Sequence, residues 1–365
     1  MRASPRPSLL LFGLASFVAC STPTSPAHRA PGDAATAKAS GARYQNPILD
    51  VDFPDPAVID GEDGFYYAYA TQTIGSSGTI NIQLARSRDL VHWEARPDAL
   101  PVKPTWASQT QKFWAPDVSK RDGKFFMYFS AEPSSRDGLC LAVAVADKPD
   151  GPFTDSGKPL QCGETFVNID PMAFDDPKTG KRLLYWGSAH KPIRVRELAP
   201  SRTEFLAGSA PLELLSVVDG PHYEKLIEGA YLIERGGSYF LFYSGDNCCG
   251  DQAHYAVMVA RSSSATGPFE KMGKALGRPS SAMVEANEHW VAPGHNSILR
   301  DAAGNDWIFY HAINPKNRLL RQDIPGDRDV RRVMLMDRIV YRDGWPHIDP
   351  AGPSSSPREA PVTRR

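Results

Sequence analysis

The sequence predicts an all-β protein, a five-bladed β-propeller, and three observations carry the prediction. A polar residue followed by a short apolar run recurs five times, at intervals of 53 to 67 residues. After each run come a Gly- or Asp-rich turn and a second, aromatic strand. The chain is rich in Pro and Gly, at 32 and 29 residues, and contains no long stretch of helical periodicity. Because a unit of this length holds the four strands of one blade, five units predict five blades.

The residue that opens each unit is polar, and in four of the five units it is a carboxylate. The five units begin Asp55-Pro-Ala-Val-Ile, Asp117-Val-Ser-Lys, Asp170-Pro-Met-Ala-Phe, Glu228-Gly-Ala-Tyr-Leu and His295-Asn-Ser-Ile-Leu. Blades of a propeller are arranged radially, so equivalent positions face one axis. We therefore expect the five openers to meet around a single central pocket.

The second strand of each unit is aromatic and closes the unit. These strands cover residues 65–69, 125–129, 183–186, 239–243 and 307–310. Large aromatic side chains dominate the energetics of buried cores. We accordingly expect Trp186, Trp290 and Trp307 to pack in the core or between blades.

The charge balance excludes nucleic acid as a partner. The net charge is −1, from 41 basic and 42 acidic residues, and the chain shows no Lys/Arg cluster with interleaved aromatics. Beyond the first 20 residues no apolar run nears the ~20 residues needed to span a bilayer.

Residues 1–20 are predicted to be a lipoprotein-type signal peptide, with Arg2 and Arg6 before an apolar core and Cys20 after Ala19. Lipid on Cys20 would tether the protein to the bacterial outer membrane or cell surface. Phe17 stands where a lipobox prefers Leu, so ordinary cleavage and a periplasmic or secreted protein is the alternative. We predict a flexible linker over residues 21–43, the propeller over 44–350 and a disordered tail over 351–365.

Four cysteines remain, an even number that suits disulfides in an exported protein. Cys140 and Cys162 could join strands of adjoining blades, and Cys248 and Cys249 could form a bond between sequence neighbours. A metal site made of this second pair with His254 is the alternative, although two adjacent thiols and one imidazole are a weak ligand set.

Carboxylates gathered on one axis favour hydrolysis of glycosidic bonds. That reaction needs one carboxylic acid to protonate the leaving oxygen and one carboxylate to activate water or attack the sugar. A third carboxylate nearby raises the pKa of the acid through like-charge repulsion. A single Asp before Pro commonly only begins a turn, but its recurrence at corresponding positions favours the catalytic interpretation.

The chain resembles the family 43 glycoside hydrolases, five-bladed inverting enzymes that act on arabinans, arabinoxylans and xylo-oligosaccharides. The resemblance lies in Asn46-Pro-Ile, Asp52-Phe-Pro-Asp55-Pro, Ser87-Arg-Asp-Leu-Val-His-Trp93, Trp114-Ala-Pro-Asp117-Val, Asn168-Ile-Asp170-Pro, Ile227-Glu228-Gly-Ala, Gly294-His295-Asn-Ser-Ile and Asp343-Gly-Trp-Pro346. It implies that Asp55 is the general base, Asp170 the pKa modulator and Glu228 the general acid. One departure is Gly-Ala after Glu228, where the family commonly has Gly-Pro.

The resemblance also bears on residues around the pocket. It implies that Asp117 shapes the site wall, that Asn168 contacts substrate and that Arg332 points inward. It places His295 on the axis, near a possible auxiliary Ca²⁺ held largely through water, with no cofactor required. His311 is expected to be nearby packing.

Sugar recognition adds two aromatic candidates, Phe53 and Trp114, which stand beside openers and could offer flat apolar faces. Because of the Gly-His-Asn-Ser segment we predict an inverting hydrolase of α-L-arabinofuranosidic bonds in arabinan or arabinoxylan, acting as a monomer on oligo- or polysaccharide. A β-1,4-xylosidase and a non-catalytic surface glycan-binding propeller are the alternatives. A retaining fructosidase on a similar propeller would need an Arg-Asp-Pro unit, which the chain lacks.

Overall fold

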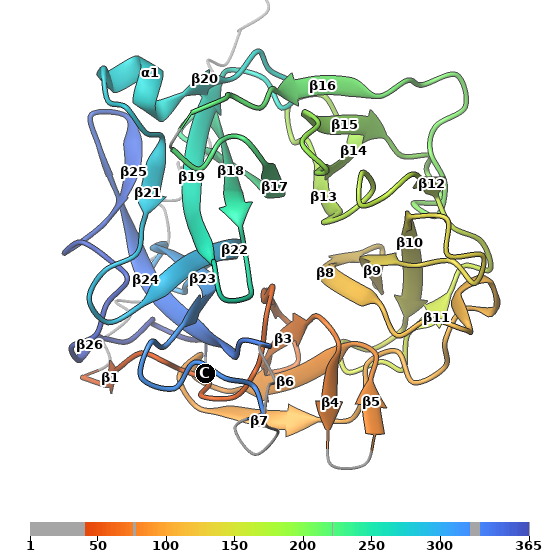
Figure 1. Ribbon diagram of the computed structural model, residues 1–365, viewed down its shortest axis with the longest axis horizontal. Coiled ribbons are helices and arrows are strands. Elements are labelled where there is room, and N and C mark those ends of the chain that lie inside the picture. The colour runs from red at the N-terminus through yellow and green to blue at the C-terminus, as the bar shows by residue number, and fades with distance from the viewer. Residues whose placement is uncertain (1–40, 76–77, 221, 322–328, 365) are drawn as a thin grey trace, which may run out of the picture. The chain divides into compact units, whose positions relative to one another are not determined.

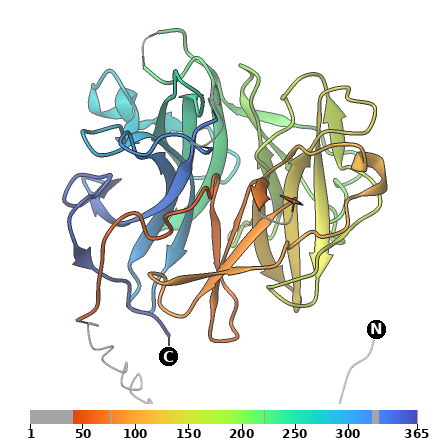
Figure 2. The same ribbon diagram turned by 60° about the horizontal axis from the view of Figure 1, so that its bottom comes forward.

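A computed structural model describes residues 41–75, 78–220, 222–321 and 329–364. The predicted signal peptide, Cys20 and most of the predicted linker lie outside these residues. Within them, five antiparallel sheets stand around a central axis (Figure 1), and Figure 2 shows the ring tilted. The predicted five-bladed propeller is confirmed.

Each blade is a meander in which strands follow one another outward from the axis. Blade 1 contains β2 (Ala57–Asp60), β3 (Tyr66–Ala70), β6 (Gln83–Ser87) and β7 (Trp93–Arg96). Blade 2 contains β8 (Phe113–Arg121), β9 (Lys124–Ala131), β10 (Leu139–Ala146), β11 (Thr154–Asp155) and β12 (Gln161–Gly163). Blade 3 contains β13 (Met172–Asp175), β14 (Arg182–Trp186), β15 (Ile193–Glu197) and β16 (Leu212–Leu215).

The last two blades hold the longest strands. Blade 4 contains β17 (Ile227–Arg235), β18 (Ser238–Asn247), β19 (His254–Ser262), β20 (Glu270–Lys271) and β21 (Ala282–Val284). Blade 5 contains β22 (Val291–Arg300), β23 (Asp306–Ile313), β24 (Arg332–Arg342) and β25 (Trp345–Ile348). Outside the blades are the hairpin β4 (Thr73–Gly75) and β5 (Gly78–Ile80), the 3₁₀ turn η1 (Thr105–Ala107) and the short helix α1 (Met272–Leu276). No helix in the described part of the chain is long and apolar enough to cross a membrane.

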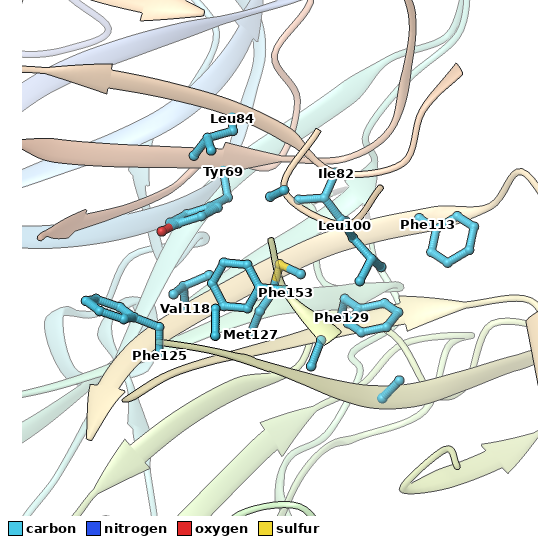
Figure 3. Packing of buried hydrophobic residues seen from close by; sticks show 14 of the residues in the cluster. Tyr69, Ile82, Leu84, Leu100, Phe113, Val118, Phe125, Met127, Phe129 and Phe153 are labelled. Carbon is cyan, nitrogen blue, oxygen red and sulfur yellow. The ribbon is translucent and has the colours of Figure 1, made fainter. Parts of the chain in front are cut away.

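The core lies between blades, because both faces of each sheet are covered by a neighbour. In strand β10 successive side chains point to opposite faces of the sheet, so they enter the cores on its two sides. Its small residues Ala142 and Ala144 belong to the core between blades 1 and 2, whereas Leu141 and Val143 belong to the core between blades 2 and 3. Figure 3 shows larger side chains of the first of these cores, among them Tyr69 and Phe129. The tryptophans predicted to be core, Trp186, Trp290 and Trp307, are at most 4% exposed.

The ring closes between blades 5 and 1 through the N-terminal segment. The amide of Ile48 donates to Met334 O (3.0 Å) and that of Phe53 to Arg332 O (2.7 Å), so the segment runs along β24. The Asn46 side chain donates to Met336 O at 2.9 Å. These contacts place the residue that follows, Asp55, at the axis.

The C-terminal residues 351–364 are ordered, so the predicted disordered tail is wrong. Strand β26 (Arg358–Glu359) pairs with β1 (Arg43–Tyr44), and Ala360 is buried. The reason is a fully buried carboxylate in β24, Asp337, which needs partners. Arg358 supplies an ion pair at 3.0 Å and the Ser354 amide a hydrogen bond at 3.1 Å. Composition indicated disorder because it does not reveal this tertiary requirement.

Both cysteine pairs are disulfides. Cys140 and Cys162 are directly opposite each other on β10 and β12, so this bond lies within blade 2 and the expected link between adjoining blades is wrong. Cys248 and Cys249 are joined in the loop between β18 and β19. The His254 imidazole pairs with Asp246 (2.7 Å), and the described residues contain no group of three or more His, Cys, Asp or Glu side chains that could hold a metal ion.

Candidate active site

In every blade a residue with a left-handed backbone lies in the inner strand or just before it, at the same end of the blade. These residues are Asp55, Ala115, Asp170, Gly229 and His295, with φ between 45° and 59°. In β8, β17 and β22 the pairing register also shifts next to this residue. Such interruptions re-aim side chains, and here they turn side chains from several blades toward the axis.

Hydrogen bonds between neighbouring blades hold these left-handed positions. The amide of Asp55 donates to His311 Nδ1 (3.1 Å), that of Ala115 to Thr71 Oγ1 (2.7 Å) and that of Asp170 to Ser130 Oγ (3.0 Å). The amide of His295 donates to Ser244 Oγ at 2.8 Å, and that of Gly229 to Asp170 Oδ2 at 3.0 Å. Each bond crosses from one blade to the next, so the ring of blades fixes the geometry of the site.

A cavity of about 520 Å³ opens at this end of the axis. Its wall contains six of the predicted site residues: Asp55, Trp114, Asp170, Glu228, His295 and Arg332. The remaining lining residues were not predicted for the site: Thr71, Phe166, Ile169, His190, Leu226, Asp246, Asn247, Cys248 and Cys249. This volume is within the range of small-molecule sites.

Asp55 is held as a carboxylate. Burial opposes its charge, but Arg332 Nη1 at 3.1 Å from Oδ1, together with His295 and His311, outweighs burial and keeps the pKa of Asp55 well below its ordinary value. Thr71 Oγ1 donates to Oδ2 at 2.5 Å. A carboxylate that stays ionised and is held in place by such partners can accept a proton from a water molecule within hydrogen-bond reach.

Glu228 is held in its acidic form. Burial raises the pKa of Glu228 to about 7, although hydrogen bonds from Tyr255 to Oε1 (2.8 Å) and from Ser188 to Oε2 (2.9 Å) act in the opposite direction. A carboxylic acid with a pKa near neutrality can donate a proton to a leaving oxygen.

Asp170 lies on the same cavity wall and is 6% exposed. Burial, the Glu228 carboxylate and the Asp55 carboxylate, in that order, raise the pKa of Asp170 well above its ordinary value. Interaction between two charges is mutual, so ionised Asp170 also disfavours loss of the proton from Glu228. The site therefore has one carboxylate kept charged and a coupled pair that retains protons.

The two histidines face Asp55 from blade 5. His295 Nδ1 lies 3.4 Å from Asp55 Oδ1 and 3.7 Å from Asp170 Oδ2, which agrees with its predicted axial position. His311 is fully buried and stacks on Tyr255, and burial lowers the pKa of His311 to about 4. His311 was expected to be packing only, but it positions Asp55 directly.

Three predicted site residues do not line the cavity. Phe53 is 2% exposed and packs in the core between blades 5 and 1, because the segment along β24 turns its ring inward. Asn168 is 1% exposed, and its Oδ1 accepts a hydrogen bond from Gln161, so it supports a loop. Asp117 accepts a hydrogen bond from the Ala173 amide (3.0 Å) and links blade 2 to blade 3.

Sequence reasoning missed most hydrogen-bond partners of the site residues. Most of these partners are neutral polar side chains on the second strand of a blade or just after it. In four successive blades a hydroxyl residue lies late in the aromatic strand or just after it: Thr71, Ser130, Ser188 and Ser244. A small hydroxyl residue at this point of each repeat is a signal that comparison of the units could have found. Tyr255 shows no such pattern, because it reaches Glu228 from the third strand of blade 4.

The described side chains fit a resident metal ion poorly. Ca²⁺ takes six to eight oxygen ligands, whereas His295 offers an imidazole whose Nδ1 already faces two carboxylates. Among described residues no cluster of three or more potential ligands exists. An ion beside His295 would depend mainly on water.

The fold is a five-bladed propeller, and its sugar-sized cavity contains one carboxylate that stays charged and another that retains its proton. Together these features define a glycoside hydrolase. A profile of glycosyl hydrolases family 43 matches residues 44–346, and the chain belongs to that family.

Relatives of known activity agree with this class. The chain is 26% identical over 322 residues to an extracellular exo-α-(1→5)-L-arabinofuranosidase of Cellvibrio japonicus, covering 82% of this chain and 87% of the relative. It is 26% identical over 307 residues to an extracellular endo-α-(1→5)-L-arabinanase of Bacillus subtilis, covering 80% and 86%.

Solved structures share the fold. A thermostable family-43 glycoside hydrolase superimposes with a TM-score of 0.68 at 24% identity, covering 87% of this chain and 99% of that one. The α-L-arabinanase of Cellvibrio cellulosa in complex with arabinohexaose has a TM-score of 0.66 at 22% identity, covering 82% and 96%.

Proposed function

We propose that this enzyme cleaves α-L-arabinofuranosidic bonds of arabinan or arabinoxylan-type polysaccharide with inversion at the anomeric carbon. The observation that carries the proposal is the opposed protonation of two carboxylates in one cavity, with Asp55 anionic and Glu228 acidic. The choice of arabinose follows the relatives, of which one is an exo-acting α-(1→5)-L-arabinofuranosidase and another an endo-acting arabinanase.

In this mechanism Asp55 is the general base and Glu228 the general acid. Asp55 takes a proton from a water molecule as its oxygen attacks the anomeric carbon, and Glu228 gives its proton to the departing glycosidic oxygen. Asp170 and Glu228 form a coupled pair in which ionisation of either carboxyl group disfavours ionisation of the other, and Asp170 Oδ2 stays fixed by the Gly229 amide. After turnover, proton exchange with solvent restores both carboxyl groups.

Substrate binding is assigned to the cavity wall. Trp114 offers a flat apolar face, and Arg332 and His295 supply polar groups beside the base. Exo or endo action is left to the substrate test, since relatives of both kinds match.

A four-substrate assay tests the proposal. The purified domain from about residue 40 is given an aryl α-L-arabinofuranoside, an aryl β-xyloside, linear arabinan and arabinoxylan, and we expect release of arabinose or arabino-oligosaccharides. Time-resolved NMR of the first product should show the inverted anomer. Cleavage of the xyloside alone would establish the xylosidase instead, and binding without cleavage on all four would establish a capture protein.

We also propose that Cys20 is lipidated and that the enzyme acts outside the cytoplasm as a monomer. Two named relatives are extracellular, and both cysteine pairs of the propeller are disulfides. Membrane fractionation of the full chain and of a Cys20→Ser variant tests the anchor, and light scattering tests the monomer. The anchor is excluded if both forms fractionate alike.

Any Ca²⁺ beside His295 is proposed to be auxiliary. Incubation with EDTA should reduce kcat less than about twofold, since the chain itself supplies few ligands. A loss comparable to that of a catalytic variant, restored by added Ca²⁺, would show that the ion is required.

A further inference from the structure

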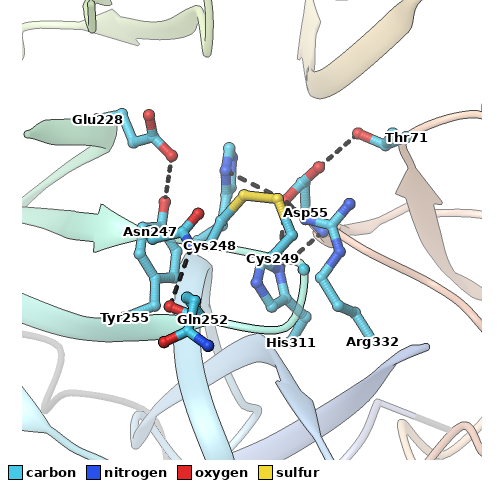
Figure 4. The surroundings of a disulfide bond; sticks show 12 residues. Asp55, Thr71, Glu228, Asn247, Cys248, Cys249, Gln252, Tyr255, His311 and Arg332 are labelled. Atoms are coloured by element: carbon cyan, nitrogen blue, oxygen red, sulfur yellow. Dashed lines mark hydrogen bonds and ion pairs between the residues drawn. A yellow bond between two sulfur atoms is a disulfide. The ribbon is translucent and has the colours of Figure 1, made fainter. Parts of the chain in front are cut away.

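The disulfide between Cys248 and Cys249 lies in the wall of the catalytic cavity. Both cysteines line the cavity that also contains Asp55 and Glu228, and both are partly exposed. In the view of Figure 4 the two sulfur atoms lie between Glu228 and the pair formed by Asp55 and Arg332. The bond therefore faces the space that substrate would occupy.

This disulfide adds little constraint to the fold. A bond between sequence neighbours closes almost no loop, and the entropic stabilisation of a disulfide grows with the loop it closes. Cys140 and Cys162, by contrast, are 22 residues apart, and Cys140 is fully buried. The two bonds thus have different consequences for stability.

The loop that carries the disulfide is held by other interactions. The ladder between β18 and β19 continues to the pair Asn247 and His254, and Asn247 Nδ2 donates to Gln252 O at 3.0 Å. Arg318 donates to the carbonyl oxygens of Gly250 (2.6 Å) and Asp251 (2.7 Å). These bonds hold the loop from both sides in addition to the sulfur–sulfur bond.

The chemistry of the exposed sulfur atoms suits the apolar face of a sugar. A disulfide has no N–H or O–H to donate and presents soft, polarisable atoms, as methionine sulfur does. Carbohydrate sites combine such apolar surfaces with a few polar groups. Here two polar residues directly before the disulfide, Asp246 and the exposed Asn247, line the same wall.

We propose that the Cys248–Cys249 disulfide is a substrate-contacting platform on which the C–H face of one pentofuranose unit of the substrate rests. This inference rests on the proposed function. The platform and Trp114 belong to different blades, β18–β19 of blade 4 and β8 of blade 2, and both line the cavity. The disulfide thereby contributes to affinity for the sugar chain without taking part in proton transfer.

Binding measurements test the platform. Linear α-1,5-arabino-oligosaccharides are titrated calorimetrically into the Glu228→Gln variant, with and without the added double change Cys248→Ser and Cys249→Ser. We expect the Kd to rise about three- to tenfold, with a Tm within about 2 °C. In the otherwise unchanged enzyme, the same double change should raise KM and leave kcat within about twofold.

The control is the double change Cys140→Ser and Cys162→Ser, which should lower Tm and leave Kd unchanged. An unchanged Kd in the Cys248/Cys249 variant overturns the platform, and so does a large drop in its Tm, since the bond would then be structural. Wild-type activity on linear arabinan separates the two proposals. An inactive wild type overturns both, whereas an active wild type with an unaffected Kd overturns the platform alone.

Discussion

Asp117 in blade 2 and Asp170 in blade 3 look alike in sequence but lie at different levels of the propeller. Asp170 is itself the left-handed residue of its inner strand, whereas in blade 2 that residue is Ala115 and Asp117 lies two positions further along. Asp170 consequently lines the catalytic cavity, and Asp117 does not. Side chains two residues apart on a strand share a face but are separated by about 6.6 Å along it.

The true counterpart of Asp117 is a structural residue in blade 5. Ser297 also lies two positions after a left-handed residue, and its Oγ accepts a hydrogen bond from the Val58 amide of blade 1 (3.0 Å). Asp117 accepts the equivalent bond from the Ala173 amide of blade 3. The comparison teaches that the level along the axis, and not the presence of a carboxylate, separates catalytic from structural positions.

The largest predicted difference between the catalytic carboxylates and the structural Asp117 is in kcat. Asp55→Asn and Glu228→Gln should each lower kcat by about 10²- to 10⁴-fold, the usual scale of general acid–base catalysis. Asp117→Asn, the matched control, should stay within about threefold. Steady-state kinetics on arabino-oligosaccharide measures all three, and an equal loss in the control would place Asp117 in the reaction.

Arg332 should set the acidic limit of activity. The base must be deprotonated, so the acidic limb of wild-type kcat/KM should lie below the ordinary pKa range of an aspartate, because the pKa of Asp55 is well below its ordinary value. Arg332→Ala removes the nearest cation, and the acidic limb should move to higher pH with a loss of about 10- to 100-fold. Arg332→Lys should restore part of the shift; identical acidic limbs in wild type and Arg332→Ala would contradict the assignment.

Asp170 should set the alkaline limit together with Glu228. The acid must be protonated, so kcat/KM should fall as pH rises through about 7, the pKa of Glu228. Repulsion within the coupled pair raises the pKa at which its last proton leaves, so Asp170→Asn should move the alkaline limb to lower pH by on the order of one unit. A pH–rate profile measures the shift, and a limb that moves upward would exclude repulsion as the cause.

The smallest effect concerns stability. Burial raises the pKa of Asp117 from 3.8 to about 6, so the folded protein holds this proton more tightly than the unfolded chain does. The contribution of Asp117 to the free energy of unfolding is fully present below pH 3.8 and is lost as pH rises through about 6. Between pH 4 and pH 8 the free energy of unfolding should therefore decrease less in the Asp117→Asn variant than in the wild type. Urea denaturation at both pH values checks this, and parallel losses would show that Asp117 titrates normally.

Regular spacing and aromatic strands were sufficient to predict the blades, and recurrent carboxylates were sufficient to predict three axial residues. Failures occurred where a residue was judged by its neighbours in sequence. Phe53 stands beside Asp55, but the extended segment along β24 sends its ring into the core. His311 was taken as packing, because no local pattern reveals that it faces Asp55 from another blade.

The sequence by itself determined the number of blades, the aromatic cores and the candidate acid and base, since these follow from local periodicity and from residue type. Tertiary structure alone decided which carboxylate stays charged and which retains its proton. The pKa of each depends on burial and on partners from other blades, such as Arg332 for Asp55 and Tyr255 for Glu228. The same is true of the ordered C-terminal segment and of the disulfide at the cavity wall, because both acquire their roles from contacts between residues far apart in the chain.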